Sequence, residues 1–315
     1  MEYVQGYQDS MSSRCPFRIV VSLSVVPWRL NRVDQVLRSL DRQTQRVDQI
    51  YLHIPWRLER TQQPYPSIPE SLQTCISQMS TPLRVCRGQD YGPITKLAPT
   101  LDLEKDPFTI LLAFDDDWIL HPRKVEVMIF SLIKFFASPL QEILRQGQQD
   151  KIPQMITQGA SQLMSNGSRI SKSMQSFEPP KVAVTGRGWH VGGKIWSSPS
   201  FFDEIDNPLT LKEISIVGGC CGFASFRCNF PSSCQALLQE RASLPSHLQS
   251  CAFFHDDMMI SAVLEKRGVQ KFVHPNRCMD PMEDLEDGLS SAKILFLKRL
   301  IPLVHYYYDQ VSSAD

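Results

Sequence analysis

Residues 109–117 read TILLAFDDD, and the fold class is inferred first from this segment. Its first six residues are almost wholly apolar, which is typical of a strand buried on both faces at the centre of a parallel sheet. Three aspartates follow without a break: Asp115, Asp116 and Asp117. Open α/β sheets bind their ligands beyond the carboxyl ends of the strands, so we expect these carboxylates to lie at a ligand site.

The three carboxylates repel one another, and a bound cation would relieve that repulsion. Hard oxygen ligands suit Mg²⁺ or Mn²⁺, metals that usually bridge one or two carboxylates to the phosphates of a substrate. The alternative is a solvated acidic turn that caps the helix opening at Pro122. The apolar strand in front of the triplet favours the metal site.

The segments around this stretch alternate between strand and helix patterns. Between the first two strands, apolar side chains recur at helical spacing: Val33, Val36, Leu37 and Leu40. Such a strand–helix–strand unit builds parallel sheets. A second helix is predicted over residues 68–79, with Ser67 as its N-cap. The predicted strands cover residues 17–25, 49–54, 82–86, 109–114, 181–185, 214–217, 223–226 and 270–273. This order predicts a single α/β domain with a mostly parallel, twisted sheet flanked by helices.

Composition excludes some classes of protein. Lysine plus arginine and aspartate plus glutamate each total 33, so the net charge is zero and a nucleic-acid-binding protein is not expected. The polar start of the chain resembles no signal peptide, and no apolar run reaches the ~20 residues of a membrane span. The nine cysteines lack disulfide or zinc spacing. We therefore expect a soluble protein in the reducing cytoplasm.

Three further segments carry chemistry. His255-Asp256-Asp257 precedes a predicted helix that ends before Gly268; one aspartate is expected to cap that helix, and the other can act as a general base. The glycines of segment 218–222 allow either close approach to a ligand or a tight turn. Lys96 follows the turn at residues 92–95. Its ammonium group can contact a phosphate, or Lys96 can be an ordinary surface group.

Together these motifs resemble glycosyltransferases of the GT-A fold, near the large family 2. Segment 21–30 with Ser39-Leu40 and Gln43-Thr44 is similar to the first strand and nucleotide loop of those enzymes. Segment 92–97 is similar to one that precedes their metal motif. The triplet at 115–117 resembles their DxD motif, segments 218–222 and 254–257 their glycine loop and acidic motif, and His274 their C-terminal metal-binding histidine. The acidic motif here departs from the usual Glu-Asp by reading His-Asp-Asp.

The resemblance implies a nucleoside-diphosphate sugar donor, a UDP- or GDP-sugar, bound with Mn²⁺ or Mg²⁺. It implies metal binding by Asp117, Asp115 and His274. It implies nucleotide or diphosphate contacts from Ser22, Pro27, Arg29, Lys96, Asp115, Asp116 and Gly219. It also implies inversion at the anomeric carbon, with Asp257 as general base and Asp256 as the second choice. The acceptor, whether glycan, lipid or protein, and the sugar stay open.

The implied domain spans residues 17–308, between tails 1–16 and 309–315. It comprises a nucleotide half (17–136), an insertion (138–180) and an acceptor half (181–308). The Gln- and Ser-rich insertion is expected to be mobile, because it has little apolar surface to bury. Two alternatives remain: a haloacid-dehalogenase-type, Mg²⁺-dependent phosphatase, and an inactive sugar-nucleotide-binding module.

Overall fold

The computed structural model describes residues 15–135, 179–189, 211–219, 222–274 and 279–281. The strands are β1 (Ile19–Ser24), β2 (Gln49–Pro55), β3 (Arg57–Leu58), β4 (Gln63–Pro64), β5 (Leu83–Gly88), β6 (Ile110–Phe114), β7 (Trp118–Leu120), β8 (Val182–Thr185), β9 (Gly188–Trp189), β10 (Lys212–Ile214), β11 (Ile216–Val217), β12 (Phe223–Phe226), β13 (Gln270–Val273) and β14 (Met279–Pro281). The α-helices are α2 (Val33–Asp41), α3 (Glu70–Gln78), α4 (Thr100–Leu103), α5 (Lys124–Ile133), α8 (Cys234–Ala242), α9 (Ser246–Phe254) and α10 (Asp256–Lys266). Short 3₁₀ turns are η1 (Pro27–Arg29), η2 (Pro93–Lys96) and η5 (Arg227–Asn229).

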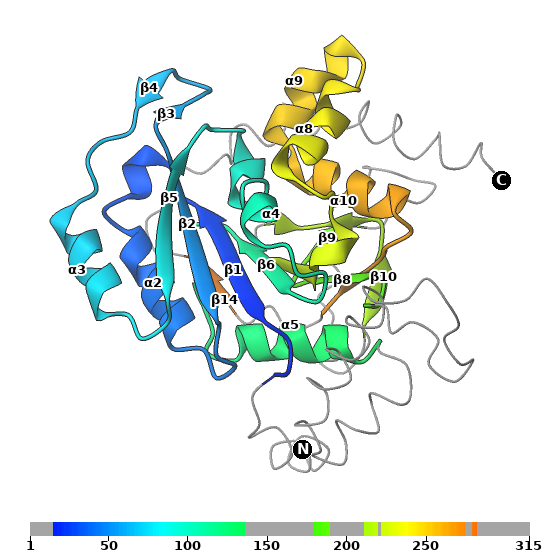
Figure 1. The fold of residues 1–315 in the computed structure, drawn as a ribbon, viewed down its shortest axis with the longest axis horizontal. Coiled ribbons are helices and arrows are strands. Elements are labelled where there is room, and N and C mark those ends of the chain that lie inside the picture. The colour runs from blue at the N-terminus through cyan, green and yellow to red at the C-terminus, as the bar shows by residue number, and fades with distance from the viewer. Residues whose placement is uncertain (1–14, 136–178, 190–210, 220–221, 275–278, 282–315) are drawn as a thin grey trace, which may run out of the picture.

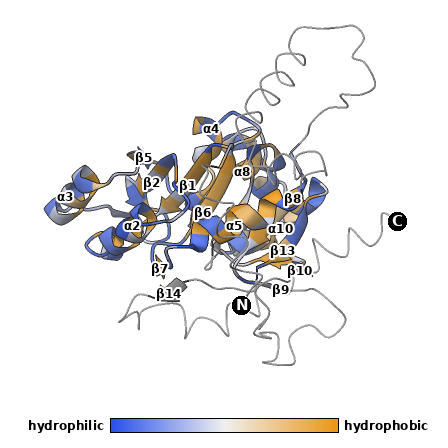
Figure 2. Ribbon diagram, turned by 90° about the horizontal axis from the view of Figure 1, so that it is seen from below, coloured by the Kyte–Doolittle hydropathy of each residue, from blue (hydrophilic) through white to orange (hydrophobic). Residues whose placement is uncertain are grey.

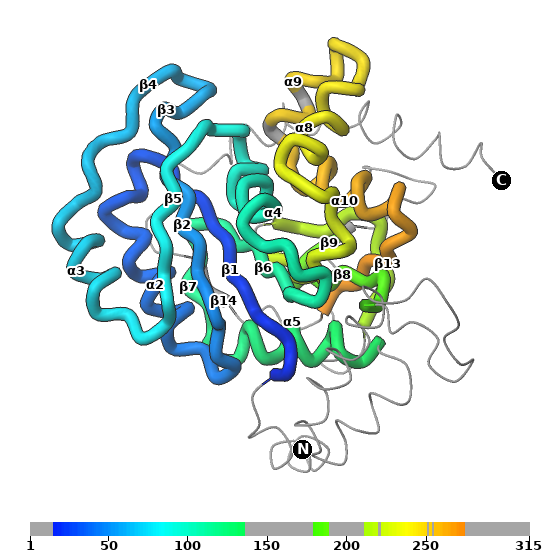
Figure 3. The backbone as a smooth tube through the Cα atoms, viewed as in Figure 1, coloured from blue at the N-terminus to red at the C-terminus, as the bar shows by residue number. Residues whose placement is uncertain are grey.

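Eight strands form one sheet in the order β10-β13-β8-β12-β6-β1-β2-β5 (Figure 1). Strands β5, β2, β1 and β6 are mutually parallel and lie side by side (Figure 3). Strand β12 runs antiparallel to both β6 and β8, β8 pairs with β13 in parallel, and β10 is antiparallel to β13. The prediction of an α/β fold with a mostly parallel sheet flanked by helices is confirmed, and the sheet is mixed in its second half.

Alternating side chains of the strands supply two hydrophobic cores. On one face, Val21, Leu112 and Phe114 pack with apolar residues of α2, α3 and α5. On the other face, Val20 and Leu111 pack with η2, α4, α8, α9 and α10. Figure 2 shows the hydrophobic colour concentrated on the central strands and the hydrophilic colour on the outer turns of α2 and α3. The sheet is therefore the middle of three layers, and β6 lies at its centre, as predicted from its wholly apolar sequence.

Some predicted element boundaries were wrong. Helix α3 begins at Glu70 behind Pro69 and has no side-chain cap, so Ser67 is not its N-cap. Proline disfavours a helical residue in front of it, which delays the start of the helix. Helix α10 begins at Asp256 as expected, but neither aspartate caps it, because the N-cap is His255. The predicted strand at 214–217 is divided between β10 and β11, which belong to different sheets.

Other predictions fall on segments that the structure does not describe. These are most of the insertion at 138–180 and the part of the acceptor half that follows residue 281.

The strand register brings several chain segments to one edge of the sheet. Phe114, at the end of β6, lies beside Leu23 near the end of β1. Phe223, at the start of the antiparallel β12, lies opposite Ala113 and Thr185, and β13 ends beside Thr185. The segments that follow β1, β6, β8 and β13, and the segment that precedes β12, therefore all emerge at this edge, here called the carboxyl edge.

Candidate functional site

The three aspartates after β6 occupy three different environments. Asp116 is buried and accepts hydrogen bonds from the Val26 backbone N–H (2.9 Å) and from Arg29 Nη1 (2.6 Å). Asp117 Oδ2 lies 3.0 Å from Arg29 Nη2. Asp115, the most exposed of the three, accepts a hydrogen bond from Lys96 Nζ at 2.6 Å. The triplet is thus an ion-pair cluster at the carboxyl edge and not a solvated turn.

Arg29 acts as a fork between two of these carboxylates. It lies in η1, directly after β1, where Pro27 occupies the first turn. The guanidinium is planar and presents paired donors, so it can hold Asp116 and Asp117 together. Sequence analysis assigned Arg29 and Pro27 to the nucleotide; the structure shows Arg29 already engaged with the triplet, and Pro27 next to it in the same turn.

Asp117 is the least satisfied member of the triplet. Its Oδ1 is buried and has no hydrogen-bond partner. Burial, reinforced by the neighbouring charge of Asp115, raises the pKa of Asp117 to about 7, although Arg29 acts in the opposite direction. Arg29 pairs with Oδ2 only, so a cation at Oδ1 could further stabilise the charged form of Asp117.

Helix α10 brings two more carboxylates to the same place. Asp256 Oδ2 lies 2.7 Å from Lys96 Nζ, an ion pair without hydrogen-bond alignment. Asp257 Oδ1 accepts a hydrogen bond from the Gly219 backbone N–H at 2.7 Å. The acidic doublet and the triplet, about 140 residues apart in the chain, therefore meet at Lys96.

The glycine segment fits closely against this cluster. A Cβ on Gly219 would lie 2.6 Å from Lys96 Nζ and 2.4 Å from Asp257 Oδ1, so any side chain would displace one of them. Gly222 has a φ of +73°, and a Cβ there would meet the ring of Phe114 at 2.2 Å. Both positions need glycine because a side chain would collide with the neighbouring groups, and Gly222 needs it also for its positive φ.

Sequence reasoning missed two hydroxyl groups that hold the glycine segment. Ser261, one turn into α10, accepts from the Val217 backbone N–H (2.9 Å) and donates to the Asp257 carbonyl (2.6 Å). Thr185 Oγ1 lies 2.8 Å from the Gly222 carbonyl oxygen and 3.1 Å from that of Gly218. Neither residue belongs to a recognisable motif, because the backbone groups of segment 217–222 that they bind are distant in sequence.

Two further predicted residues are placed by other contacts. The Ser22 side chain is buried in β1, and its Oγ lies 2.6 Å from Thr100 Oγ1, which in turn contacts His53 Nε2. The Ser22 side chain is therefore engaged within the protein, in a strand that is paired on both sides. His274 is buried at the carboxyl edge, where its backbone N–H donates to the Thr185 carbonyl at 2.7 Å.

The side chains available as metal ligands determine how a metal could be held. Among the described residues, no group of three or more His, Cys, Asp or Glu side chains is arranged to enclose a metal ion. Around Lys96 and Arg29, however, five carboxylates face two cationic side chains, and Asp117 has an unpartnered oxygen. Mg²⁺ typically binds through one or two carboxylates plus substrate phosphates. The residues present fit a metal that arrives with a diphosphate, and not a metal held by protein ligands alone.

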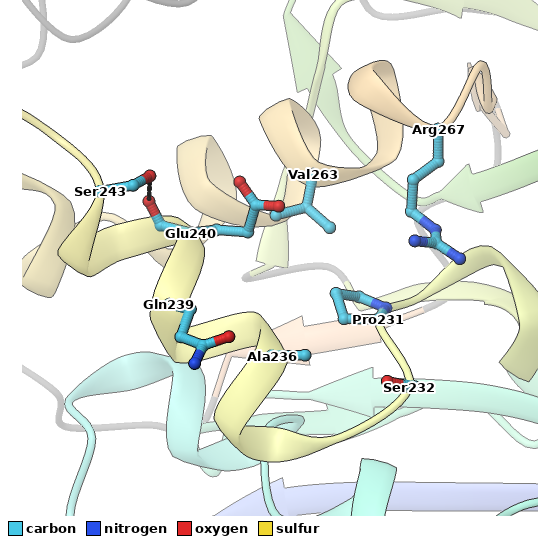
Figure 4. A pocket seen from close by; sticks show the side chains of 8 residues that line it. All are labelled: Pro231, Ser232, Ala236, Gln239, Glu240, Ser243, Val263 and Arg267. Atoms are coloured by element: carbon cyan, nitrogen blue, oxygen red, sulfur yellow. Dashed lines mark hydrogen bonds between the residues drawn. The ribbon is translucent and has the colours of Figure 1, made fainter.

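A separate hollow of about 400 Å³ lies between α8 and α10 (Figure 4). Its lining includes Pro231, Glu240, Val263 and Arg267, and none of the residues of the ion-pair cluster. It has no cluster of carboxylates, so we place the candidate site at the carboxyl edge.

Comparison with known proteins adds no assignment, since no family model matches the chain and no curated protein matches it significantly. Within the part of the chain that is described, no helix has the length and apolar character needed to cross a bilayer.

Proposed function

We propose that the chain is a metal-dependent glycosyltransferase of the GT-A type that uses a UDP- or GDP-sugar. One observation carries the proposal: the triplet that follows the central strand and the doublet that opens α10 converge on one buried lysine. Donor-binding and proton-accepting carboxylates must flank the same reacting carbon in such an enzyme. The location at the carboxyl edge of an α/β sheet supports the proposal further.

In this proposal Asp117 holds Mn²⁺ or Mg²⁺ together with the donor diphosphate, with Asp115 and His274 as further candidate ligands. When bound, the metal would stabilise the negative charge that develops on the leaving diphosphate. Arg29 holds Asp116 and Asp117 in place, and the backbone of residues 22–27 lines the nucleotide. The unpartnered Oδ1 of Asp117 is the feature of this chain that supports the metal.

Asp257 is the proposed general base. Its Oδ1 is fixed by Gly219, and its side chain is less deeply buried than that of Asp256, which is paired with Lys96. A base must reach the acceptor hydroxyl, so the more accessible carboxylate fits the role better. The acceptor oxygen would attack from the face opposite the diphosphate, and the configuration of the sugar would be inverted.

The proposal includes a cytoplasmic setting, in which the described cysteines stay reduced; five of them are free thiols.

The direct test is a hydrolysis screen with UDP-, GDP- and TDP-sugars, each with Mn²⁺ and with excess EDTA. We expect Mn²⁺-dependent release of a nucleoside diphosphate from at least one donor. Metal-dependent cleavage of p-nitrophenyl phosphate without cleavage of any nucleotide sugar would favour the phosphatase instead. Metal-dependent binding without cleavage or transfer would leave the inactive binding module.

A further inference from the structure

Several contacts hold the segment that carries Lys96 in place. The Asp90 carboxylate accepts hydrogen bonds from the Gly92 backbone N–H (2.9 Å) and from Thr95 Oγ1 (3.0 Å). Gly92 has a φ of +80°, and a Cβ there would lie 2.6 Å from the Phe253 carbonyl oxygen of α9. Arg241, in α8, donates to the Tyr91 carbonyl at 2.9 Å. These contacts hold turn η2, which ends at Lys96, against the layer of helices α8 and α9.

The lysine itself is held between the two halves of the chain. Its side chain is 3% exposed, and its amine contacts Asp115 of the β6 edge and Asp256 of α10. A buried ammonium group is stable only while its charged partners stay in contact with it. In addition, Gly219 leaves no space on a third side of the amine. If either carboxylate moves away, one of the two ion pairs that hold the buried ammonium between β6 and α10 is lost.

We propose that Lys96 is a positioning residue: it fixes the first turn of α10, and with it Asp257, relative to the triplet that binds the donor. This inference rests on the proposed function for the meaning of the two carboxylate groups. It differs from the role that sequence analysis gave Lys96, which was direct contact with the diphosphate. Both contacts of its amine are instead made to protein carboxylates.

The two roles have different consequences for a variant without the charge. If Lys96 binds the diphosphate, Lys96→Met weakens donor binding and turnover together. If Lys96 positions α10, nucleotide binding is largely kept, because Asp117 keeps its contact with Arg29 although Asp115 loses its ion pair, while the general base is displaced. A displacement of about 1 Å can reduce turnover by about 10²-fold.

The test uses the full chain, with Lys271→Met as the matched control. Lys271 is equally buried, at 2% side-chain exposure, and pairs with Glu265 at the other end of α10. Three quantities are measured: affinity for UDP with Mn²⁺ by calorimetry, hydrolysis of the donor that the wild type cleaves fastest, and amide hydrogen exchange. We expect Lys96→Met to keep the affinity within about threefold, to lower turnover by about 10²-fold or more, and to speed exchange in residues 256–260. Lys271→Met should change neither turnover nor exchange in residues 256–260.

A parallel loss of UDP affinity and turnover in Lys96→Met would overturn the proposal, and so would unchanged exchange in residues 256–260. If Lys96→Met does not fold, Asp256→Asn can be used instead, because it removes only the ion pair between Lys96 and α10. This variant should show the same faster exchange in residues 256–260. Exchange at the wild-type rate in these residues would contradict the proposal. If the wild type binds neither UDP nor GDP in a Mn²⁺-dependent way, the proposed function fails. The exchange comparison alone then decides whether Lys96 holds α10.

Discussion

At the scale of single residues, the site is a set of carboxylates that differ in how many hydrogen-bond and ion-pair partners the fold gives them. Asp116 has an arginine and a backbone N–H as partners, whereas Asp117 shares the arginine and keeps one buried oxygen without a partner. Functional sites commonly hold groups whose pKa values are displaced by burial and by neighbouring charge. Asp117 is such a group, and its ionisation should be visible in the stability of the protein.

Replacing Asp117 with asparagine should stabilise the metal-free protein above pH 7. An aspartate with a pKa near 3.8 when unfolded and about 7 when folded binds more protons in the folded state between these values. Its contribution to stability is therefore favourable at low pH and is lost as the pH rises from 4 to 7. In urea unfolding at pH 8, Asp117→Asn should raise the free energy of unfolding by about 1–3 kcal/mol, with little effect at pH 4.

Asp116→Asn is the matched control for this measurement. Burial also raises the pKa of Asp116, but Arg29 and the Val26 N–H oppose that shift, and the substitution weakens the ion pair with Arg29, so Asp116→Asn should be less stabilising at pH 8 than Asp117→Asn. Equal changes in the free energy of unfolding from both substitutions would show that Asp117 is as well satisfied as Asp116.

Asp257→Asn tests the general base. The amide keeps the size of the side chain and can still accept the Gly219 N–H through its oxygen, but it cannot take a proton from an acceptor hydroxyl. Turnover should fall by about 10²–10⁴-fold while UDP affinity with Mn²⁺ stays nearly unchanged. Full turnover in this variant, together with its loss in Asp256→Asn, would move the base to Asp256.

At the scale of elements, predictions succeeded where one stretch of sequence decides the outcome. The four apolar residues at helical spacing in α2 are all buried, and the apolar run before the triplet is the central strand. Helices α8 and α9 were not predicted, because α8 buries only Cys234 and Leu237 and so shows no apolar stripe. The start of α3 was predicted too early, although the local sequence marks it, because Pro69 disfavours a helical residue in front of it.

Two of the glycines with positive φ, Gly222 and Gly268, allow an element-scale prediction. Gly222 opens β12 against the Phe114 ring, whereas Gly268, after α10, has a φ of +68° and open space around its Cβ position. Gly268→Ala should cost only the backbone strain, about 1 kcal/mol. Gly222→Ala adds a clash with the central strand and should cost about 3 kcal/mol or more in urea unfolding. Similar losses in both variants would mean that Phe114 can move aside.

At the scale of the whole molecule, the fold assembles the site from segments spread over the chain. Sequence analysis named the members of the ion-pair cluster, because acidic runs at strand and helix ends are visible as motifs. It did not pair them: that Arg29 binds Asp116 and Asp117, and that Lys96 joins Asp115 to Asp256, depends on the sheet order and on the position of α10. A lone lysine carries no local sign of burial when its second partner lies 160 residues away.

The proposed function requires that the triplet binds a metal together with a nucleoside diphosphate. The most direct measurement is calorimetry of UDP and GDP binding to the wild type and to Asp117→Asn, each with Mn²⁺ and with EDTA, at pH 8. We predict that Mn²⁺ strengthens binding of one nucleotide to the wild type by about tenfold or more and that Asp117→Asn abolishes this gain. The gain should shrink below pH 7, because a metal ligand must be deprotonated. Equal affinity with and without Mn²⁺ in the wild type would contradict the account.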